Sequence, residues 1–247
     1  ETLEKPLVIT YHSVVPNPEK ERKEIVRKIS QKARCIVIMN KLGIEILRKQ
    51  YGLKNNIEII PHGIHEVPFK RSEEEKEKAG YKDRIILSSF GLLRTGKGIE
   101  YVIQSLPRVV KRFPNILYLI VGETHPVEKR KKGENYRKFL EKLVKKLKLQ
   151  NNVKFYNKYL TLSEIFKFLL MTDIYIAPCL NPNQITSGTI AYALGCGRVV
   201  VSTPTLQAKD IIKKDRGAIV KMKDPDSYAE AIIKILSNKK LKEKMEK

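Results

Sequence analysis

The sequence predicts an α/β protein whose main part is a doubly wound parallel sheet. Short runs rich in β-branched residues alternate with longer amphipathic stretches along the 247 residues, which is the pattern of repeated β-α units. Hydrophobic residues make up 42% of the chain, enough to bury a sizeable core and to exclude a disordered protein. No apolar run approaches the roughly 18 to 20 residues that span a bilayer.

Nine short apolar runs are expected to form strands. They are residues 7–11, 35–39, 57–60, 85–90, 117–121, 153–156, 174–177, 199–202 and 218–221. Helices are expected between them, with examples at 98–112, 135–147, 163–171, 189–195 and 227–236. Asp224 and Asp226 stand just before the last helix. Their Asp-x-Asp spacing can hold a metal, but the position favours a helix cap.

The strand pattern lapses between residues 61 and 83, and a domain boundary is expected near residue 68. Residues 69–247 are expected to form a complete doubly wound domain. Residues 1–68 hold only three strands, which is a thin core, so they are expected to be the latter part of a larger N-terminal α/β domain. The chain begins with Glu1 rather than Met, in keeping with that expectation.

The chain is strongly basic. It has 49 Lys and Arg against 27 Asp and Glu, a formal net charge of +22. This excess attracts phosphate in nucleic acid, in an anionic membrane or in a small molecule. Interleaved Lys and Glu are also typical of solvated helix faces and of the surfaces of thermophile proteins. Three separated cysteines argue against a disulfide framework and a zinc site and, without a signal segment, predict a cytoplasmic protein.

The first candidate site is the turn at residues 90–98, between an expected strand and an expected helix. Its glycines, beginning with Gly91, let the backbone approach a ligand, and Arg94 and Lys97 add two cations beside the helix N-terminus. This set suits a phosphate or diphosphate. It is not a P-loop, because Gly98 stands where a hydroxyl would hold magnesium. A glycine-rich turn with two surface cations is the alternative.

The second candidate site is the turn at residues 178–189. It offers consecutive amides and hydroxyls at a helix start, from Thr186 to Thr189. Both turns follow parallel strands, so they are expected at the carboxyl edge of the sheet, where ligands of open α/β sheets bind. Together they predict a site for one diphosphate, the common part of nucleotide-sugar donors. The alternative is that Ser187 or Thr186 merely caps the helix.

Five segments carry a resemblance to a known family. They are Leu-Val-Ile-Thr-Tyr-His at 7–12, Ile-Pro-His-Gly-Ile at 60–64, the turn at 91–98, Ile-Val-Gly-Glu at 120–123 and Ala-Leu-Gly-Cys-Gly-Arg-Val-Val at 193–200. They resemble the retaining glycosyltransferases of the two-domain GT-B fold, the glycosyl transferases group 1, particularly the mannosyltransferase-like branch. The resemblance implies a Rossmann-like donor-binding domain at 69–247 and an acceptor-side domain ending near residue 68.

The resemblance also implies a reaction. A hexosyltransferase of this kind moves a hexose, with mannose favoured, from a nucleotide-diphospho-sugar to a glycan or lipid-linked acceptor, with retention and without a metal or other cofactor. The catalytic residues are expected to be His12, Arg94 and Lys97. The donor-binding residues are expected to be Gly91, Gln184, Ser187, Gly188, Thr189 and Tyr192.

The sequence departs from the family pattern at two places. Leu92 stands where the family loop has Arg, and Arg94 follows two residues later. Gln184 and Tyr192 replace the two carboxylates of the family's Glu-x7-Glu motif, so they can still form hydrogen bonds with a sugar but bring no charge. A subgroup of the family has a similar Gln-Ile-Thr-Ser-Gly-Thr sequence to residues 184–189, so the resemblance implies a variant transferase. An inactive donor-domain fragment stays an alternative.

Other functions remain open at this stage. An epimerase or phosphorylase on the same fold would add an acid/base carboxylate or a pyridoxal-bearing lysine, and neither is found in the sequence. A basic module that binds nucleotides or nucleic acid is supported only by charge, because no nucleic-acid-binding motif is present. A lipid-linked acceptor would give residues 129–132, Lys-Arg-Lys-Lys, a role in peripheral contact with an anionic membrane.

Overall fold

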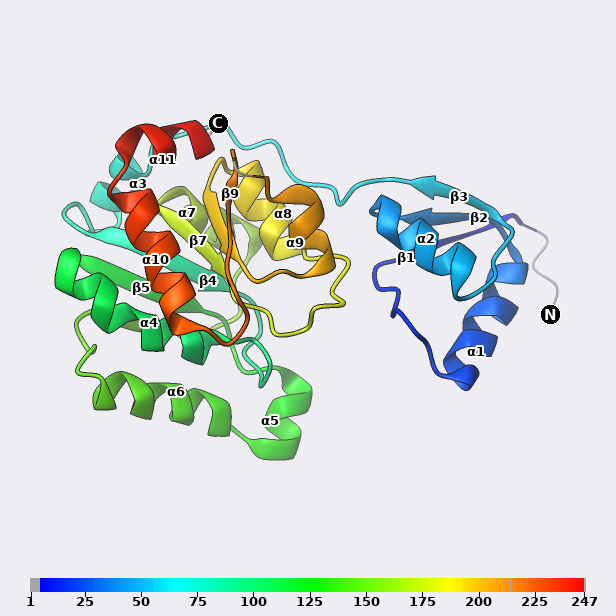
Figure 1. The fold of residues 1–247 in the computed structure, drawn as a ribbon, viewed down its shortest axis with the longest axis horizontal. Helices are drawn as coiled ribbons and strands as arrows, with labels where there is room; N and C mark the ends of the chain where they lie inside the picture. The colour runs from blue at the N-terminus through cyan, green and yellow to red at the C-terminus, as the bar shows by residue number, and fades with distance from the viewer. Residues whose placement is uncertain (1–4, 214, 247) are drawn as a thin grey trace. The chain divides into compact units, whose positions relative to one another are not determined.

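The structure, a computed structural model, describes residues 5–213 and 215–246. The chain divides into two compact units (Figure 1). The first ends at Gly63 and also includes the short segments Pro182–Gly188 and Thr205–Gln207; the second contains the remaining residues from Ile64 onward. The boundary proposed near residue 68 differs from this division, which falls a few residues earlier and assigns part of the second candidate turn to the first unit.

The first unit is a three-stranded parallel sheet with two helices. The strands follow the order β1-β2-β3. Its core is formed by apolar residues of β2 and of the second helix, such as Ile36 and Leu47, and it includes Ile185 from the later segment. The elements are β1 (Leu7–Tyr11), α1 (Lys20–Gln31), β2 (Ala33–Ile38), α2 (Lys41–Lys49) and β3 (Asn56–Ile59).

The second unit is built on a six-stranded parallel sheet with the order β6-β5-β4-β7-β8-β9. The described strands are β4 (Ile85–Phe90), β5 (Ile116–Val121), β6 (Val153–Tyr156), β7 (Ile174–Ala177), β8 (Val199–Ser202) and β9 (Gly217–Ile219). This arrangement confirms the predicted doubly wound sheet. Chain order reverses between β4 and β7, and open α/β sheets bind ligands in the crevice outside the carboxyl ends of the strands at such a switch point.

Helices cover both faces of this sheet (Figure 1). Successive residues of each buried strand enter opposite cores: Tyr118 of β5 packs with the helices α4, α6 and α10, whereas Leu119 packs toward the face that carries α7. Two further helices, α8 and α9, pack on the β7 and β8 part of that second face. The helices are α3 (Ser72–Lys78), α4 (Ile99–Arg112), α5 (Pro126–Lys132), α6 (Asn135–Lys146), α7 (Leu162–Leu170), α8 (Gly188–Gly195), α9 (Leu206–Ile211), α10 (Pro225–Leu236) and α11 (Lys239–Met245).

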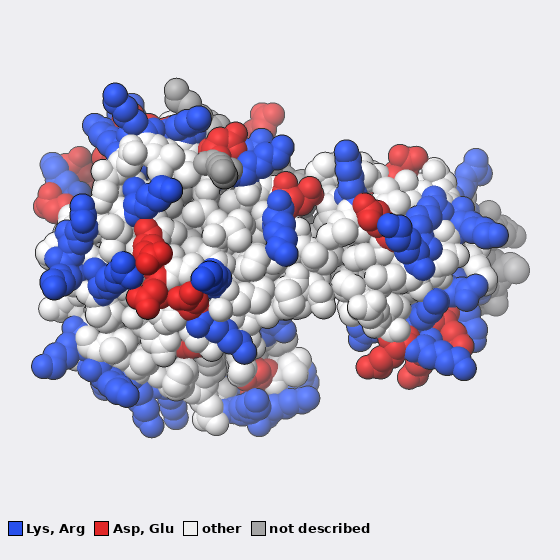
Figure 2. All heavy atoms as spheres, in the orientation of Figure 1, with Lys and Arg blue, Asp and Glu red and all other residues white. Residues whose placement is uncertain are grey.

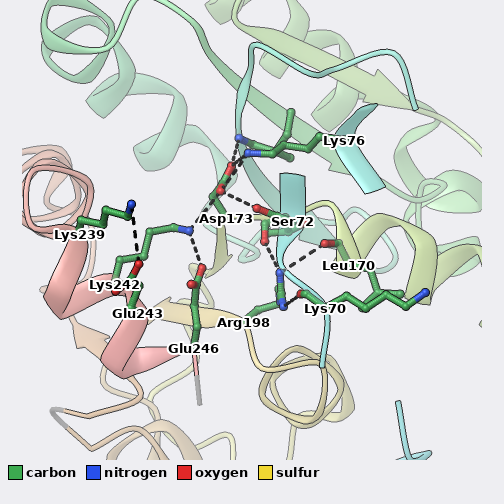
Figure 3. A network of polar contacts seen from close by, with 12 residues as sticks. Lys70, Ser72, Lys76, Leu170, Asp173, Arg198, Lys239, Lys242, Glu243 and Glu246 are labelled. Atoms are coloured by element: carbon green, nitrogen blue, oxygen red, sulfur yellow. Dashed lines mark hydrogen bonds and ion pairs between the residues drawn. The ribbon is translucent and has the colours of Figure 1, made fainter. Parts of the chain in front are cut away.

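A buried ionic network joins α3 and α11 to the start of β7 (Figure 3). Asp173 accepts hydrogen bonds from Ser72 Oγ at 2.8 Å and from Lys76 Nζ at 3.1 and 3.2 Å, and Lys242 Nζ lies 3.3 Å from the same carboxylate. Asp173 also accepts the Ile86 amide at 2.7 Å, which ties the network to β4. The network therefore fastens the first and the last described helices of the second unit to the base of its sheet.

Arg198 performs a similar task beside this network (Figure 3). It is 1% exposed, and its guanidinium donates to the carbonyl of Leu170 at 3.3 Å and to that of Lys70 at 2.6 Å. Its guanidinium carbon also lies 5.4 Å from the ring centre of Phe69. These contacts hold the segment that precedes α3 against the end of α7 and the start of β8.

Positive side chains are spread over the surface. Figure 2 shows Lys and Arg scattered across the visible face of the second unit, with Asp and Glu between them. Many form exposed ion pairs, such as Arg108 with Asp226 at 3.1 Å, which contribute little to stability. Asp224 accepts the Ser227 amide at 3.1 Å, which confirms the predicted cap of α10.

Candidate functional site

The first predicted phosphate turn lies at the switch point of the sheet. It follows β4, and the residues after the neighbouring strand β7 pack against it: the Leu180 amide donates to the Gly96 carbonyl at 3.0 Å. A Cβ on Gly98 would lie 2.0 Å from the Pro178 carbonyl oxygen. The backbone at the end of β7 therefore touches the start of α4, and only a glycine leaves room for this contact.

The first turn leads directly into the N-terminus of α4. Gly98 is its N-cap residue, with φ of 76° in the left-handed region, and no described side chain caps the helix. The first amides of a helix have no partner within it, and they carry partial positive charge. Helix N-termini of this kind bind phosphate groups, so these amides favour an anionic ligand.

Lys97 directs a partly buried ammonium at the same place. Its Nζ lies 3.1 Å from the position of a Cβ built on Gly91. Burial lowers the pKa of Lys97; the nearby Cys179 acts against this, and the charge of Arg94 adds to it. No acidic side chain among the described residues forms an ion pair with Lys97. A cation held in this way is best compensated by an anionic ligand.

Arg94 is exposed in the same turn, three residues before Lys97. The next residue, Thr95, donates its hydroxyl to Glu128 of α5 at 2.7 Å. This contact holds the tip of the turn on α5. Arg94 thus adds positive charge at the mouth of the site, and which phosphate oxygen it contacts stays a prediction.

The second predicted turn is divided between the two units. In the first unit, Gln184 donates its side-chain amide to the Thr186 carbonyl at 3.1 Å, and Gln207 donates to the Ser187 carbonyl at 3.4 Å. A Cβ on Gly188 would lie 3.0 Å from His62 Nε2. Thr186 Oγ1 is buried and has no hydrogen-bond partner among the described residues, so it does not cap α8.

Thr189 and Tyr192 belong to the second unit. Thr189 hydrogen-bonds with Tyr175 of β7. Burial raises the pKa of Tyr175 to about 12, against the effect of its hydrogen bonds with Thr189 and the Phe90 backbone, so the tyrosine stays protonated at neutral pH. Tyr192 packs edge-on against Phe166, with ring centres 5.9 Å apart. Thr189 is therefore connected to the end of β4, where the first turn begins.

His12 directly follows β1 in the first unit and is exposed. Its predicted contact with the donor sugar stays a prediction. The structure thus brings Gly91, Arg94 and Lys97 together with the end of β7 in the second unit, whereas Gln184, Ser187 and Gly188 share the first unit with His12.

The sequence did not indicate a hollow beside the first turn. It has a volume of about 270 Å³ at the carboxyl ends of β4, β5 and β6. Glu123 of its wall accepts the Tyr159 amide at 3.1 Å. The lining residues are Phe90, Gly91, Leu92, Val121, Gly122, Glu123, Lys158, Tyr159, Leu160 and Ile165. An aromatic and aliphatic wall with a few polar groups, next to an anion site, suits a flat ring joined to a phosphate.

The loop after β5 forms backbone hydrogen bonds with the first turn. The Leu93 amide donates to the Glu123 carbonyl at 2.7 Å, and the His125 amide donates to the Leu93 carbonyl at 2.7 Å. Leu93 and Thr124 form an isolated parallel bridge. The phosphate turn is therefore held in a backbone ladder that extends β4 and β5 past their ends.

Within residues 5–213 and 215–246, no helix is both long enough and apolar enough to traverse a bilayer. No group of three or more His, Cys, Asp or Glu side chains in these residues is arranged to bind a metal ion.

A parallel sheet of this strand order, with a glycine-rich turn at its switch point and a hollow beside that turn, is typical of nucleotide-binding α/β domains. The model of the family described as Glycosyl transferases group 1 matches residues 70–247, and the chain belongs to this family. The resemblance to the glycosyl transferases group 1 is thereby confirmed.

The chain is similar to two uncharacterized glycosyltransferases of Methanocaldococcus jannaschii. It is 25% identical to MJ1069 over 226 residues, which cover 89% of this chain and 54% of that protein. It is 29% identical to MJ1059 over 180 residues, which cover 69% of this chain and 40% of that protein. The chain therefore spans about half the length of the curated relatives it matches.

Solved structures show the same fold. HepE of Anabaena, in complex with UDP and glucose, superposes with a TM-score of 0.81 at 18% identity, over 98% of this chain and 65% of HepE. Sucrose-phosphate synthase of Thermosynechococcus elongatus superposes with a TM-score of 0.79 at 19% identity, over 97% of this chain and 61% of that enzyme. These likenesses confirm the predicted GT-B-like architecture.

Proposed function

We propose that the chain is the donor-binding part of a glycosyltransferase that transfers a hexose, with mannose favoured, from a nucleotide-diphospho-sugar to a glycan or lipid-linked acceptor. The observation that carries the proposal is the proximity of the N-terminus of α4 and the Lys97 ammonium at the switch point of the sheet, where no described side chain caps the helix or pairs with the lysine. Both features favour a diphosphate.

Lys97 and Arg94 would stabilise the charge that grows on the diphosphate as the sugar departs. Amides around Ser187, Gly188 and Thr189 would supply further donors. Loss of one such fixed group typically slows a reaction by about a hundredfold or more, because the group acts where transition-state charge develops. Transfer with retention in this manner needs neither a protein nucleophile nor a metal ion.

The base of the nucleotide would occupy the hollow that begins at Gly91. This hollow adjoins the phosphate turn, and Phe90 and Tyr159 give it an aromatic wall. UDP in HepE makes a uridine nucleotide a reasonable probe, and GDP-mannose follows from the mannosyltransferase-like resemblance. Both nucleotides belong in the first binding panel.

His12 and Gln184 are proposed to contact the donor sugar, and Tyr192 is proposed to contact the ribose of the nucleotide. Gln184 already uses its amide nitrogen on the Thr186 carbonyl, so its carbonyl oxygen would be the group that accepts from a sugar hydroxyl. Tyr192 supplies one hydroxyl. Neither residue brings the charge of a carboxylate, so sugar recognition would rest on neutral hydrogen bonds.

The test compares turnover of nucleotide sugars by Lys97→Ala with that by Lys111→Ala. Lys111 is an exposed lysine in the last turn of α4, and its removal changes net charge equally. The proposal predicts a loss of about a hundredfold for the first variant and none for the second. Turnover by Lys97→Ala within about threefold of wild type would refute the role of the phosphate turn.

A lipid-linked acceptor would place the enzyme at an anionic membrane. Helix α5 has no buried residues, its last turn is Lys129, Arg130, Lys131 and Lys132, and Val127 beside them is 42% exposed. This combination supports peripheral contact. Co-sedimentation with phosphatidylserine vesicles should fall when Arg130 and Lys131 are changed to Gln; unchanged sedimentation would exclude the contact at α5.

A further inference from the structure

The proposed reaction does not use a buried arginine at the start of α6. Arg137 is 5% exposed, donates from Nη2 to the Gly122 carbonyl at 2.9 Å and from Nε to Glu134 at 3.2 Å. Its Nη1 is buried and has no partner among the described residues. Burial of a guanidinium costs free energy, so we expect the buried Arg137 side chain to have a specific role.

The carbonyl that Arg137 holds belongs to the residue on which the phosphate turn rests. Gly122 has φ of 136°, and a Cβ there would lie 2.3 Å from the Gly91 carbonyl oxygen. The Gly91 amide donates to the Val121 carbonyl at 3.0 Å. The orientation of the Gly122 peptide therefore fixes the position of Gly91 in the phosphate turn.

Glu134 contacts the same turn by a second route. Its carboxylate accepts the Thr124 hydroxyl, and Thr124 forms a backbone bridge with Leu93 of the phosphate turn. The hydrogen bond from Thr124 lowers the pKa of Glu134, and Arg137 adds to this effect. The carboxylate is therefore ionised at neutral pH and holds Thr124 and Arg137 together.

Tyr136 makes a third contact, with the helix that receives the diphosphate. Its hydroxyl donates to Glu100, a residue in the first turn of α4. Burial and the hydrogen bond to Glu100 both raise the pKa of Tyr136, so the tyrosine keeps its proton. The start of α6 is thus connected to the loop after β5, to the phosphate turn and to α4.

We infer that Glu134, Tyr136 and Arg137, here termed the α6 brace, are positioning residues for the donor diphosphate. They do not touch the ligand. They fix the Gly122 peptide, the Leu93–Thr124 bridge and the first turn of α4, and so hold the amides and Lys97 where the diphosphate binds. This inference rests on the proposed function, since it assigns the brace to the same site.

The test compares Arg137→Met with Arg84→Met. Arg84 makes the same kind of contact at the opposite end of β5: it donates to the Ile116 carbonyl at 2.9 Å and to the Asn151 carbonyl at 2.6 Å. Its Nε is also buried without a partner among the described residues. Both variants remove a guanidinium that donates to main-chain carbonyls, so both should lower the thermal midpoint. Only Arg137 lies beside the phosphate turn and also pairs with a carboxylate, that of Glu134.

Two quantities are measured: amide hydrogen exchange in the unliganded protein and calorimetric affinity for UDP and GDP. Arg137→Met should speed exchange at residues 91–98 and weaken nucleotide binding, each by about tenfold, which is the loss expected for a hydrogen bond to a charged group. Arg84→Met should leave both unchanged. Arg137→Lys should recover part of the affinity, because an ammonium can still donate to Gly122.

Equal effects of the two methionine variants on exchange and affinity would overturn the inference. If Arg137→Met does not fold, Tyr136→Phe carries the test, because it removes one hydroxyl and should speed exchange at the start of α4. If the wild-type chain binds no nucleotide, the proposed function fails at that step. The exchange measurement then still decides whether the brace holds the turn.

Discussion

At the scale of single residues, Lys97 is the side chain whose environment most favours an anionic ligand. Its ammonium is partly buried, Arg94 repels it, and no acidic group among the described residues pairs with it. Burial disfavours the charged form of Lys97 and so lowers its pKa. A bound phosphate would stabilise the charged form. The sequence predicted this residue from its place between two glycines at a strand-to-helix turn, with a surface cation as the alternative.

This environment predicts a pH dependence of nucleotide binding. Because the pKa of Lys97 is lowered in the free protein, its charge is lost at lower pH than that of an ordinary lysine. Affinity for UDP or GDP should therefore decline as pH rises toward about 10, the ordinary lysine pKa. Calorimetric titrations from neutral to alkaline pH would measure this decline.

Lys97→Arg is the control, because arginine stays charged over the whole pH range. The variant should bind nucleotide with an affinity that no longer falls at alkaline pH. The same decline in wild type and Lys97→Arg would assign the pH dependence to another group.

Arg137 and Glu134 were not predicted from the sequence as parts of the site. Tyr136 and Arg137 lie four and three residues before Leu140, so they share the apolar face of α6. A charged residue on a core-facing stripe is a signal that could have been recognised. The partner of Arg137, the Gly122 carbonyl, could not be recognised from the sequence. The two groups meet only because α6 packs against the end of β5.

At the scale of elements, the strands of the large sheet were largely predictable. The runs at β4, β6, β7 and β8 have the predicted bounds, and β5 begins one residue earlier. Strand β9 begins one residue earlier than predicted and ends two residues earlier. Buried parallel strands are continuous apolar runs, so their limits are visible in the sequence. The order of the strands was not predictable in this way, because it depends on which helix crosses which face.

The contact between the ends of β4 and β7 gives a matched prediction. Gly98 and Gly80 both have φ of 76°, but a Cβ on Gly98 would meet the Pro178 carbonyl, whereas a Cβ on Gly80 would meet nothing within 4 Å. Gly80→Ala should cost about 1 kcal/mol of unfolding free energy for its left-handed backbone. Gly98→Ala should cost at least about 2 kcal/mol more, because backbone must move.

Denaturant unfolding of the two variants measures this difference. Equal losses of stability would show that the ends of β4 and β7 are not in close contact. Nucleotide binding should also fall in Gly98→Ala and not in Gly80→Ala, because only Gly98 lies at the N-terminus of α4.

The network around Asp173 predicts a second difference in stability. Asp173→Asn leaves the buried Lys76 without its carboxylate, so it should cost about 3 kcal/mol of unfolding free energy. Asp226→Asn, which removes the exposed partner of Arg108, should cost less than about 1 kcal/mol. Similar losses in the two variants would contradict the buried placement of the network.

The network around Asp173 also predicts a loss of stability at alkaline pH. Burial lowers the pKa of Lys242, but the charges of Asp173 and Glu246 outweigh burial and raise it. A raised folded-state pKa means that the contribution of Lys242 is complete below the unfolded pKa of lysine, about 10.4. It is lost as pH rises through the higher folded-state value, so stability should begin to fall only above about pH 10.

At the scale of the whole molecule, the net charge of +22 does not identify the ligand. The positive side chains are spread over many elements and interleaved with acidic ones (Figure 2). Composition therefore left nucleic acid, membrane and phosphorylated small molecules open. Family membership and the position of the phosphate turn within the sheet distinguish among them, and both required more than composition.

The most direct test of the account is calorimetric titration of the chain and of Lys97→Ala with UDP- and GDP-sugars, at about 0.05 and 0.2 M salt. Wild type should bind at least one of these donors with an affinity that changes little with salt, and Lys97→Ala should lose about a hundredfold. Binding of donors that is equal in both proteins, or binding only of nucleic acid with an affinity that falls steeply with salt, would contradict it.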